Sequence, residues 1–285
     1  MQSINIGDIV ARKSYGSDIL FKVVAKEEIE NKINYLLKGI CYRLEADALE
    51  NDLIVQSEKR VSEYTRNTLV QAKNHLSKNR KSRKRHAYRQ AGQNFMTNCK
   101  ILHVDGDDSY LKLCLEQYKK NNINAIGVFV PEKEQPNEIL RLLKKHKPDI
   151  LVLTGHDGVI KSKNGYSDIS NYRTSKYFID AVKVAREYEK NMDDLVIFAG
   201  ACQSMYINII KAGANFASSP FRVLIHALDP VFICKLIATS SVDKIISPEE
   251  IINATITGQK GIGGIQTRGK KRYGYPVDNF TNTKK

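Results

Sequence analysis

Residues 100–199 contain four short apolar runs rich in valine, isoleucine and leucine: KILHV (100–104), AIGVFV (125–130), DILVLT (149–154) and DLVIFA (194–199). Continuous runs of this kind are typical of β-strands that are covered on both faces. Between them, apolar residues recur at helical spacing in YLKLCLEQYKK (110–120), NEILRLLKKH (137–146) and YFIDAVKVAREYE (177–189). Strands that alternate with crossovers of helical length predict an α/β domain with a parallel, doubly wound sheet and helices on both faces.

The N-terminal residues, 1–56, follow a different pattern. Short stretches of alternating polarity are separated by turn residues, as in DIVAR, ILFKVVA, INYLLKGICY and LIVQ. This pattern predicts a small SH3-like β-barrel of about five strands. The barrel holds no group of residues with recognisable chemistry, so we interpret it either as a docking or regulatory module or as a folded cap on the next domain.

Most of the net charge of +14 lies in one segment. Residues 64–104 hold ten Lys or Arg and no Asp or Glu, and they therefore carry +10 of it. The segment begins as a helix-like stretch and ends in SKNRKSRKRHAYRQ (77–90), which has no hydrophobic period. Such a tract is typical of a solvated linker. We predict a barrel at 1–56, a helix and basic linker at 57–98, and an α/β domain at 99–285.

The basic linker leaves a second function open, which is the binding of nucleic acid or another polyanion through phosphate neutralisation. Aromatic residues that would stack on bases amount to Tyr88 alone in this tract. We therefore do not expect nucleic acid to be the main partner.

The composition, 42% hydrophobic and 27% charged residues, is that of a globular protein and excludes a disordered or collagen-like chain. No apolar stretch is long enough to span a membrane, and the start lacks the pattern of a signal peptide. We expect a cytoplasmic protein with no membrane partner. The five cysteines are an odd number at unrelated spacings, which indicates a reducing compartment and no structural metal.

Chemistry is expected where the strands end, because ligands in this architecture bind beyond the carboxyl ends of the strands. His156 follows one apolar run in LTGHDG, and Cys202 follows the next in FAGACQS. Two neighbouring parallel strands would bring both residues to one edge of the sheet. A cysteine thiolate is a strong nucleophile, and histidine transfers protons near neutral pH. A helix expected to begin near Ser204 would place its N-terminal dipole close to Cys202 and favour the thiolate.

Three of the other cysteines occupy core-like positions in a helix, an apolar run and a barrel strand: Cys114, Cys234 and Cys41. Acidic residues follow the first apolar run, in DGDD (105–108). We interpret them as a turn that leads into the N-cap of a helix.

Residues 100–154 also resemble a response-regulator receiver domain, in which an Asp after the third strand accepts phosphate. This sequence places Thr154 at that position, and threonine cannot form the acyl phosphate. A degenerate receiver-like regulatory domain therefore remains an alternative.

The pair LTGHDG and FAGACQSMY resembles the caspase, clostripain and gingipain clan of cysteine peptidases. Nearly the whole chain, including GDIVARKSYGSDILFKV and GIGGIQTRGKKRYGYP, resembles the YabG family of sporulation peptidases from spore-forming bacteria. The resemblance implies a caspase-like endopeptidase without metal or cofactor, acting in the mother cell on spore coat and cortex-associated proteins and located in the mother-cell cytoplasm and the spore coat. It implies that Cys202 is the nucleophile and that His156 is the general acid and base.

The clan resemblance also implies an oxyanion hole made of two backbone N–H groups, one of them from Cys202. The second would follow the histidine. Because Asp157 stands between His156 and Gly158, either Asp157 or Gly158 supplies it.

Arg-selective relatives in the clan imply cleavage after Arg, because a buried carboxylate can pair bidentately with a guanidinium. The candidate carboxylates for this pocket are Asp180 and Asp229. The arginines of the basic linker are candidate sites of self-cleavage: Arg80, Arg83, Arg85 and Arg89.

Overall fold

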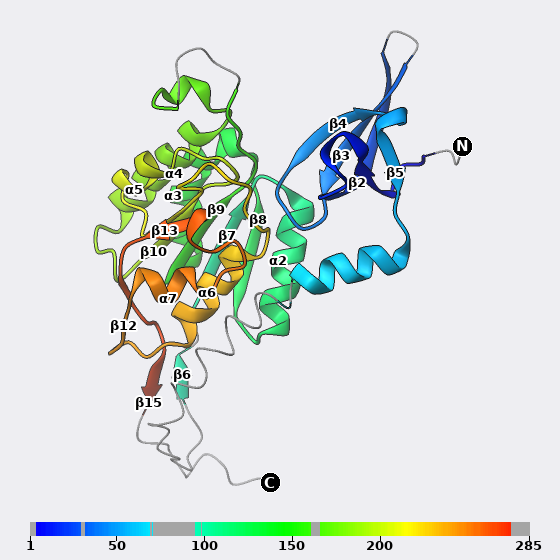
Figure 1. The fold of residues 1–285 in the computed structure, drawn as a ribbon. Coiled ribbons are helices and arrows are strands. Elements are labelled where there is room, and N and C mark those ends of the chain that lie inside the picture. Colours follow the sequence, from blue (N-terminus) through cyan, green and yellow to red (C-terminus); the bar gives the residue numbers. More distant parts are fainter. Residues whose placement is uncertain are drawn as a thin grey trace.

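The computed structural model describes residues 4–29, 32–68, 70, 95–97, 99–160 and 166–274. It has an N-terminal antiparallel sheet and a larger α/β part, which Figure 1 shows side by side. Residues 58–68, directly after the N-terminal sheet, are helical. Within the described residues no helix is long and apolar enough to cross a bilayer.

The N-terminal sheet has five antiparallel strands in the order β4-β3-β2-β1-β5. They are β1 (Ile9–Arg12), β2 (Leu20–Ile29), β3 (Lys32–Gly39), β4 (Glu45–Leu49) and β5 (Leu53–Val55). Alternate residues point to one face and form its core, among them Val10, Val23 and Leu37. The expected antiparallel strands are confirmed, whereas closure into a barrel and the domain boundaries stay predictions.

The large sheet has six strands in the order β13-β11-β10-β9-β7-β8. The first five along the chain pair in parallel: β7 (Ile101–Asp105), β8 (Ala125–Phe129), β9 (Ile150–Thr154), β10 (Val196–Ala199) and β11 (Phe216–Ser218). β13 (Ile262–Gly264) pairs antiparallel at the edge. All four apolar runs are therefore strands of one parallel-dominated sheet, as the sequence predicts.

Helices cover both faces of this sheet. Because strand side chains alternate, Ile150 and Val152 pack with one set of helices, while Leu151 and Leu153 pack with the other. The first set is α2 (Asp108–Lys120), α6 (Asp229–Thr239) and α7 (Pro248–Ile252), and the second is α3 (Gln135–His146), α4 (Ser175–Tyr188) and α5 (Tyr206–Lys211).

The remaining elements are short. Two strand pairs join β12 (Ile245–Ile246) to β14 (Thr267–Arg268) and β6 (Phe95–Thr97) to β15 (Arg272–Gly274). Single turns of 3₁₀-helix are η1 (Lys13–Tyr15), η2 (Glu50–Asp52), η4 (Glu132–Glu134), η5 (Ile169–Asn171) and η6 (Gly258–Lys260).

The strand order fixes where a ligand would bind. From β7 the chain moves outward to β8 and then returns past β7 to β9, so the direction of winding reverses between β7 and β9. Ligands of open α/β sheets bind at such a reversal, beyond the carboxyl ends of the strands. The residues after β7 and after β9 therefore face the expected site.

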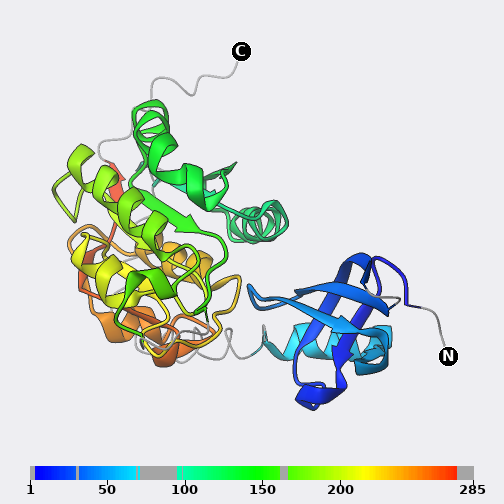
Figure 2. The ribbon, with the colours of Figure 1, turned by 90° about the horizontal axis from the view of Figure 1, so that it is seen from above.

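The N-terminal sheet contacts this edge through the end of β3, the start of β4 and the residues between them. The residues between β3 and β4, 40–44, are called the β3–β4 loop below, and Figure 2 shows the light-blue hairpin that carries them pointing at the α/β part. Tyr42 of this loop forms an isolated antiparallel bridge with His226. The loop therefore lies against the carboxyl edge of the large sheet.

Candidate active site

His156 lies two residues beyond the end of β9, and a backbone hydrogen bond fixes its position. Its N–H donates to Oε1 of Glu132 at 2.6 Å. A Cβ on Gly155 would lie 2.2 Å from the same oxygen, so only glycine leaves room for the Glu132 carboxylate beside the histidine. The glycine before His156 thus has a steric reason to be there.

The imidazole of His156 contacts an acidic residue from the end of β7. Its Nε2 lies 2.7 Å from Oδ2 of Asp107, and its side chain is 23% exposed. Asp107 is also the N-cap of α2, accepting from the N–H groups of Ser109 and Tyr110, which confirms the expected cap. Burial alone would raise the pKa of Asp107, but hydrogen bonds from His156 and Lys38 hold it well below its ordinary value.

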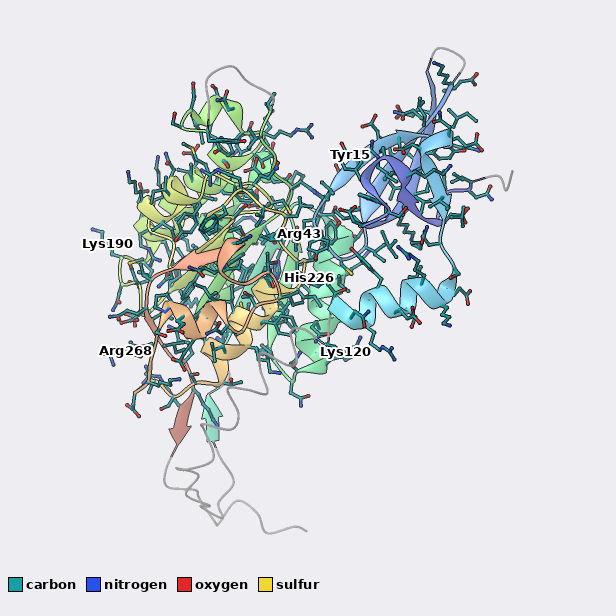
Figure 3. All side chains as sticks on the ribbon, in the orientation of Figure 1. Tyr15, Arg43, Lys120, Lys190, His226 and Arg268 are labelled. Carbon is teal, nitrogen blue, oxygen red and sulfur yellow. The ribbon has the colours of Figure 1, made fainter. Side chains whose placement is uncertain are left out.

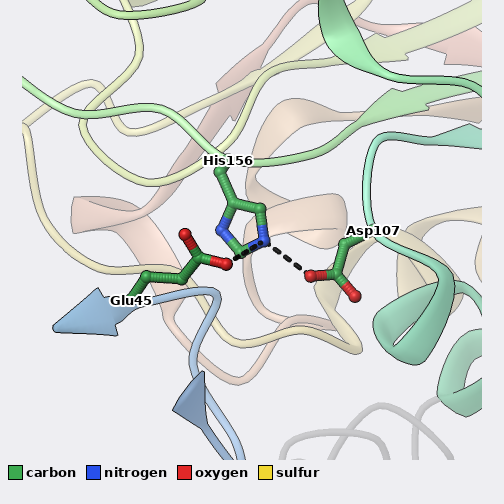
Figure 4. A group of neighbouring side chains, drawn as sticks. All are labelled: Glu45, Asp107 and His156. Atoms are coloured by element: carbon green, nitrogen blue, oxygen red, sulfur yellow. Dashed lines mark hydrogen bonds and ion pairs between the residues drawn. The ribbon is translucent and has the colours of Figure 1, made fainter. Parts of the chain in front are cut away.

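Glu45, the first residue of β4, completes a cluster around this ring. Its Oε1 lies 3.6 Å from Nε2 of His156, and Figure 4 shows the imidazole between the two carboxylates. Glu45, Asp107 and His156 are close enough to hold a metal ion. However, the ammonium of Lys38 pairs with the same Asp107 oxygen. Its charge disfavours a cation there, and the geometry is that of an ion-pair network.

Cys202 lies beyond the end of β10, which pairs directly with β9. The two expected site residues thus emerge at one edge of the sheet, as predicted. The thiol is buried, with 1% of the residue exposed, and it accepts a hydrogen bond from the N–H of Ile225 at 3.2 Å. The hydrogen bonds of the described residues do not include one between Cys202 and His156.

The pKa of the Cys202 thiol differs from the sequence expectation. Burial raises it to about 11, although the N–H of Ile225 and the charge and N–H of Arg43 act in the opposite direction. The helix that follows, α5, begins only at Tyr206 and has six residues. The expected helix dipole therefore does not produce a low thiol pKa, because desolvation outweighs it in this buried position.

Asp157 ties the histidine and cysteine loops together. Its Oδ1 accepts from the N–H groups of Gly158 at 2.8 Å and Thr174 at 3.0 Å. Its Oδ2 accepts from the hydroxyls of Ser175 and Ser204. The carboxylate thus acts as a scaffold, and the N–H of Gly158 is engaged by it.

A cavity of about 390 Å³ lies over this edge. One wall comes from the α/β part and includes His156, Asp157, Gly158 and Gln203. The other wall comes from the N-terminal sheet: Arg43, Leu44 and Glu45. The N-terminal module therefore forms part of the site, which its sequence pattern did not indicate.

Arg43 was not singled out by its sequence, yet it is fully buried at this edge. Its Nη1 and Nη2 donate to the two oxygens of Asp105 at 2.9 and 2.7 Å. Asp105 ends β7 and is fully buried too. Among the sequence signals, only the acidic DGDD stretch after the first strand pointed to this position, and there as a turn.

The expected carboxylates for an Arg pocket lie elsewhere. Asp180 is on α4 with its side chain 39% exposed, and it pairs with Lys183. Asp229 is fully buried at the start of α6, where its oxygens accept from Ile256 and Thr257 and burial raises its pKa to about 6. Neither lines the cavity that His156 lines.

The remaining predictions concern three cysteines and the arginines of the basic linker. Cys114 and Cys234 are buried in α2 and α6, as expected, and Cys41 is buried in the β3–β4 loop rather than in a strand. The candidate self-cleavage arginines lie outside the described residues: Arg80, Arg83, Arg85 and Arg89.

Comparisons with known proteins converge on one group. A family model described as YabG peptidase U57 matches residues 5–276. The sporulation-specific protease YabG of Bacillus subtilis (strain 168) is 42% identical over 283 residues, which cover 95% of this chain and 97% of that protein. No solved structure matches.

Proposed function

Because the chain belongs to the YabG peptidase family U57, we propose that it is a cysteine endopeptidase of sporulation in which Cys202 is the nucleophile and His156 the general acid and base. The observation that carries this proposal is the position of the two residues. They follow neighbouring parallel strands, β9 and β10, at one edge of a sheet, and the family model spans both.

The chemistry would proceed through an acyl-enzyme. His156 takes the proton of the Cys202 thiol as the sulfur bonds to the scissile carbonyl carbon. The C–N bond then breaks as His156 gives that proton to the leaving amine. Water then attacks the thioester carbon, His156 takes its proton, and the C–S bond breaks. Asp107 orients the imidazole and stabilises its charged form, as the 2.7 Å contact supports.

The oxyanion that forms in each step needs two N–H donors. One is the N–H of Cys202, and the other is that of Asp157 or Gly158. The engagement of the Gly158 N–H by the Asp157 carboxylate favours Asp157 as the second donor.

The substrates and setting are proposed from the resemblance. We assign spore coat and cortex-associated proteins as substrates, cleavage after Arg as the specificity, and the mother cell and spore coat as the location. The similar Bacillus subtilis protein is described as a sporulation-specific protease, which supports the setting. The caspase-like arrangement of the sheet belongs to the same proposal.

The experiment compares wild type with Cys202→Ala and His156→Ala, each incubated with a spore coat extract and followed by mass spectrometry of the products. Both variants should lose cleavage. Cys99→Ser and His146→Ala are matched controls away from the cavity and should cut like wild type. Wild-type cleavage by Cys202→Ala and His156→Ala would reject the assignment.

A further inference from the structure

The β3–β4 loop contacts the α/β part through its backbone. The carbonyl of Cys41 accepts from the N–H of Ala227 at 2.9 Å, and Tyr42 bridges His226 in antiparallel register. His226 and Ala227 directly follow Ile225, whose N–H donates a hydrogen bond to the Cys202 sulfur. Backbone pairing with a free edge is one way in which proteins bind peptides.

The loop is also held from the helix side. The hydroxyl of Tyr110 donates toward the carbonyl oxygens of Gly39 and Tyr42, 2.6 Å from each. The N–H of Leu44 donates to the carbonyl of Tyr42 at 2.8 Å, which places Arg43 at the apex of a tight turn. Figure 3 labels Arg43 and His226 where the two parts of the molecule meet.

The side chain of Arg43 is fully buried between a carboxylate and an aromatic ring. Its guanidinium makes the bidentate contact with Asp105 and lies 5.0 Å from the ring of Tyr110. Asp105 is itself oriented, because its Oδ1 accepts from the N–H of Asp107 at 3.0 Å and its Oδ2 lies 3.4 Å from Nε2 of His103. A buried, oriented carboxylate that pairs bidentately with a guanidinium is the chemistry that selects an arginine side chain.

The order of contacts along the loop matches the order of the reacting groups. Tyr42, the residue before Arg43, bridges His226, and the N–H of the preceding Ile225 donates to the Cys202 sulfur. Arg43 lies close enough that its charge and its N–H lower the pKa of that thiol. The next two residues, Leu44 and Glu45, line the cavity with His156. The peptide bond from Arg43 to Leu44 thus joins a residue beside the nucleophile to a residue that lines the cavity with His156.

We propose that the β3–β4 loop is an internal substrate: Arg43 occupies the pocket for the residue before the scissile bond, Asp105 is the specificity residue of that pocket, and Cys202 cuts the Arg43–Leu44 bond. This inference rests on the proposed function of Cys202 and His156. The uncut chain is latent, because its own loop fills the site that an external substrate needs.

The self-cleavage balances as one hydrolysis. The Cys202 thiol gives its proton to His156 as its sulfur bonds to the Arg43 carbonyl carbon. The bond from that carbon to the Leu44 nitrogen breaks, and the nitrogen leaves with the proton from His156. One water then cleaves the thioester. The products are a fragment 1–43 that ends in a carboxylate and a fragment 44–285 that begins with a free amine.

The first arm of the test follows purified wild type over time by intact-mass spectrometry under denaturing conditions. Fragments 1–43 and 44–285 should accumulate in wild type and be missing from Cys202→Ala. Arg43→Ala should not be cut at this position, whereas Arg12→Ala, which alters an arginine of β1 that pairs with Asp52, should be cut like wild type.

The peptide comparison of the second arm uses the wild-type enzyme alone, so it does not depend on the folding of a variant. The synthetic peptide KGICYRLEADAL, residues 38–49, is incubated with pre-cleaved wild type, beside the same peptide with Gln in place of Arg43. The enzyme should cut the first peptide after Arg and the second about a hundredfold more slowly or not at all. Asp105→Asn should lose most of this preference, and Asp180→Asn should keep it.

The outcomes separate the two proposals. If wild type cuts other bonds in a Cys202-dependent manner but leaves Arg43–Leu44 intact in both the chain and the peptide, the internal-substrate inference is wrong and the peptidase assignment stands. If no substrate is cut in a Cys202-dependent manner, the proposed function itself fails.

Discussion

The guanidinium of Arg43 and the carboxylate of Asp105, 62 residues apart in the chain, form a bidentate ion pair in which both side chains are fully buried. This pair joins the N-terminal sheet to the carboxyl end of β7. Burial alone would raise the pKa of Asp105, but the charge of Arg43 and the hydrogen bond from His103 hold it well below its ordinary value. The contact thus holds the N-terminal sheet against the edge of the large sheet at which His156 and Cys202 lie.

Removing one member of this ion pair should lower the stability of the protein. In a Cys202→Ala background, which prevents cleavage, we expect Asp105→Asn to lower the free energy of unfolding by about 3–5 kcal/mol, because a buried charge is left uncompensated. Unfolding in urea measures this change in the free energy of unfolding. Asp180→Asn, in the exposed pair with Lys183, should change stability by about 0.5 kcal/mol or less. Equal effects of the two substitutions would contradict the burial argument.

Asp107 should act on catalysis through His156. We expect Asp107→Asn to lower kcat by about a hundredfold or more with a smaller change in KM, because the imidazole loses its orienting carboxylate and the charge that stabilises its protonated form. Asparagine can still cap α2, so the fold should persist. The measurement is kcat and KM for an arginine peptide as a function of pH, and an unaltered kcat would exclude the role.

Acid should weaken the contact between the N-terminal sheet and the α/β part. The pKa values of Asp105 and Asp107 lie below the ordinary carboxyl value of 3.8 in the folded protein. Their stabilisation is therefore complete above about pH 4 and is lost as the pH falls below it. The urea midpoint of Cys202→Ala should drop between pH 5 and pH 3. In the double variant that also carries Asp105→Asn the drop should be smaller, and equal drops in the two proteins would contradict this prediction.

The thiol of Cys202 should be unreactive while the loop covers it. Burial raises its pKa to about 11, so few thiolates exist at neutral pH, and alkylation by iodoacetamide should rise about tenfold per pH unit between pH 7 and 9. Arg43→Ala should loosen the loop, hydrate the thiol and speed labelling at pH 7. Peptide mapping by mass spectrometry separates Cys202 from the other cysteines. Equal labelling rates in both proteins would show that the loop does not shield the thiol.

Several features of this protein can be read from local pattern. The period of apolar residues is enough to place the four parallel strands and the helices between them, because it depends only on neighbours in the chain. The positions of His156 and Cys202 after neighbouring strands follow from the same pattern. Asp107 as the cap of α2 is also local, since a cap bonds the N–H groups that follow it.

The rest depends on contacts between distant residues, which no local period encodes. Arg43 lies just beyond an expected strand, and nothing in its local sequence indicates burial. It is buried where its guanidinium pairs with Asp105 and lies beside the ring of Tyr110. The second role of Asp107 depends on β7 and β9 being neighbours. The high thiol pKa of Cys202 also depends on the packed chain, because burial raises it by more than the N–H of Ile225 and the charge of Arg43 lower it. Pairing and desolvation across such separations are properties of the packed chain.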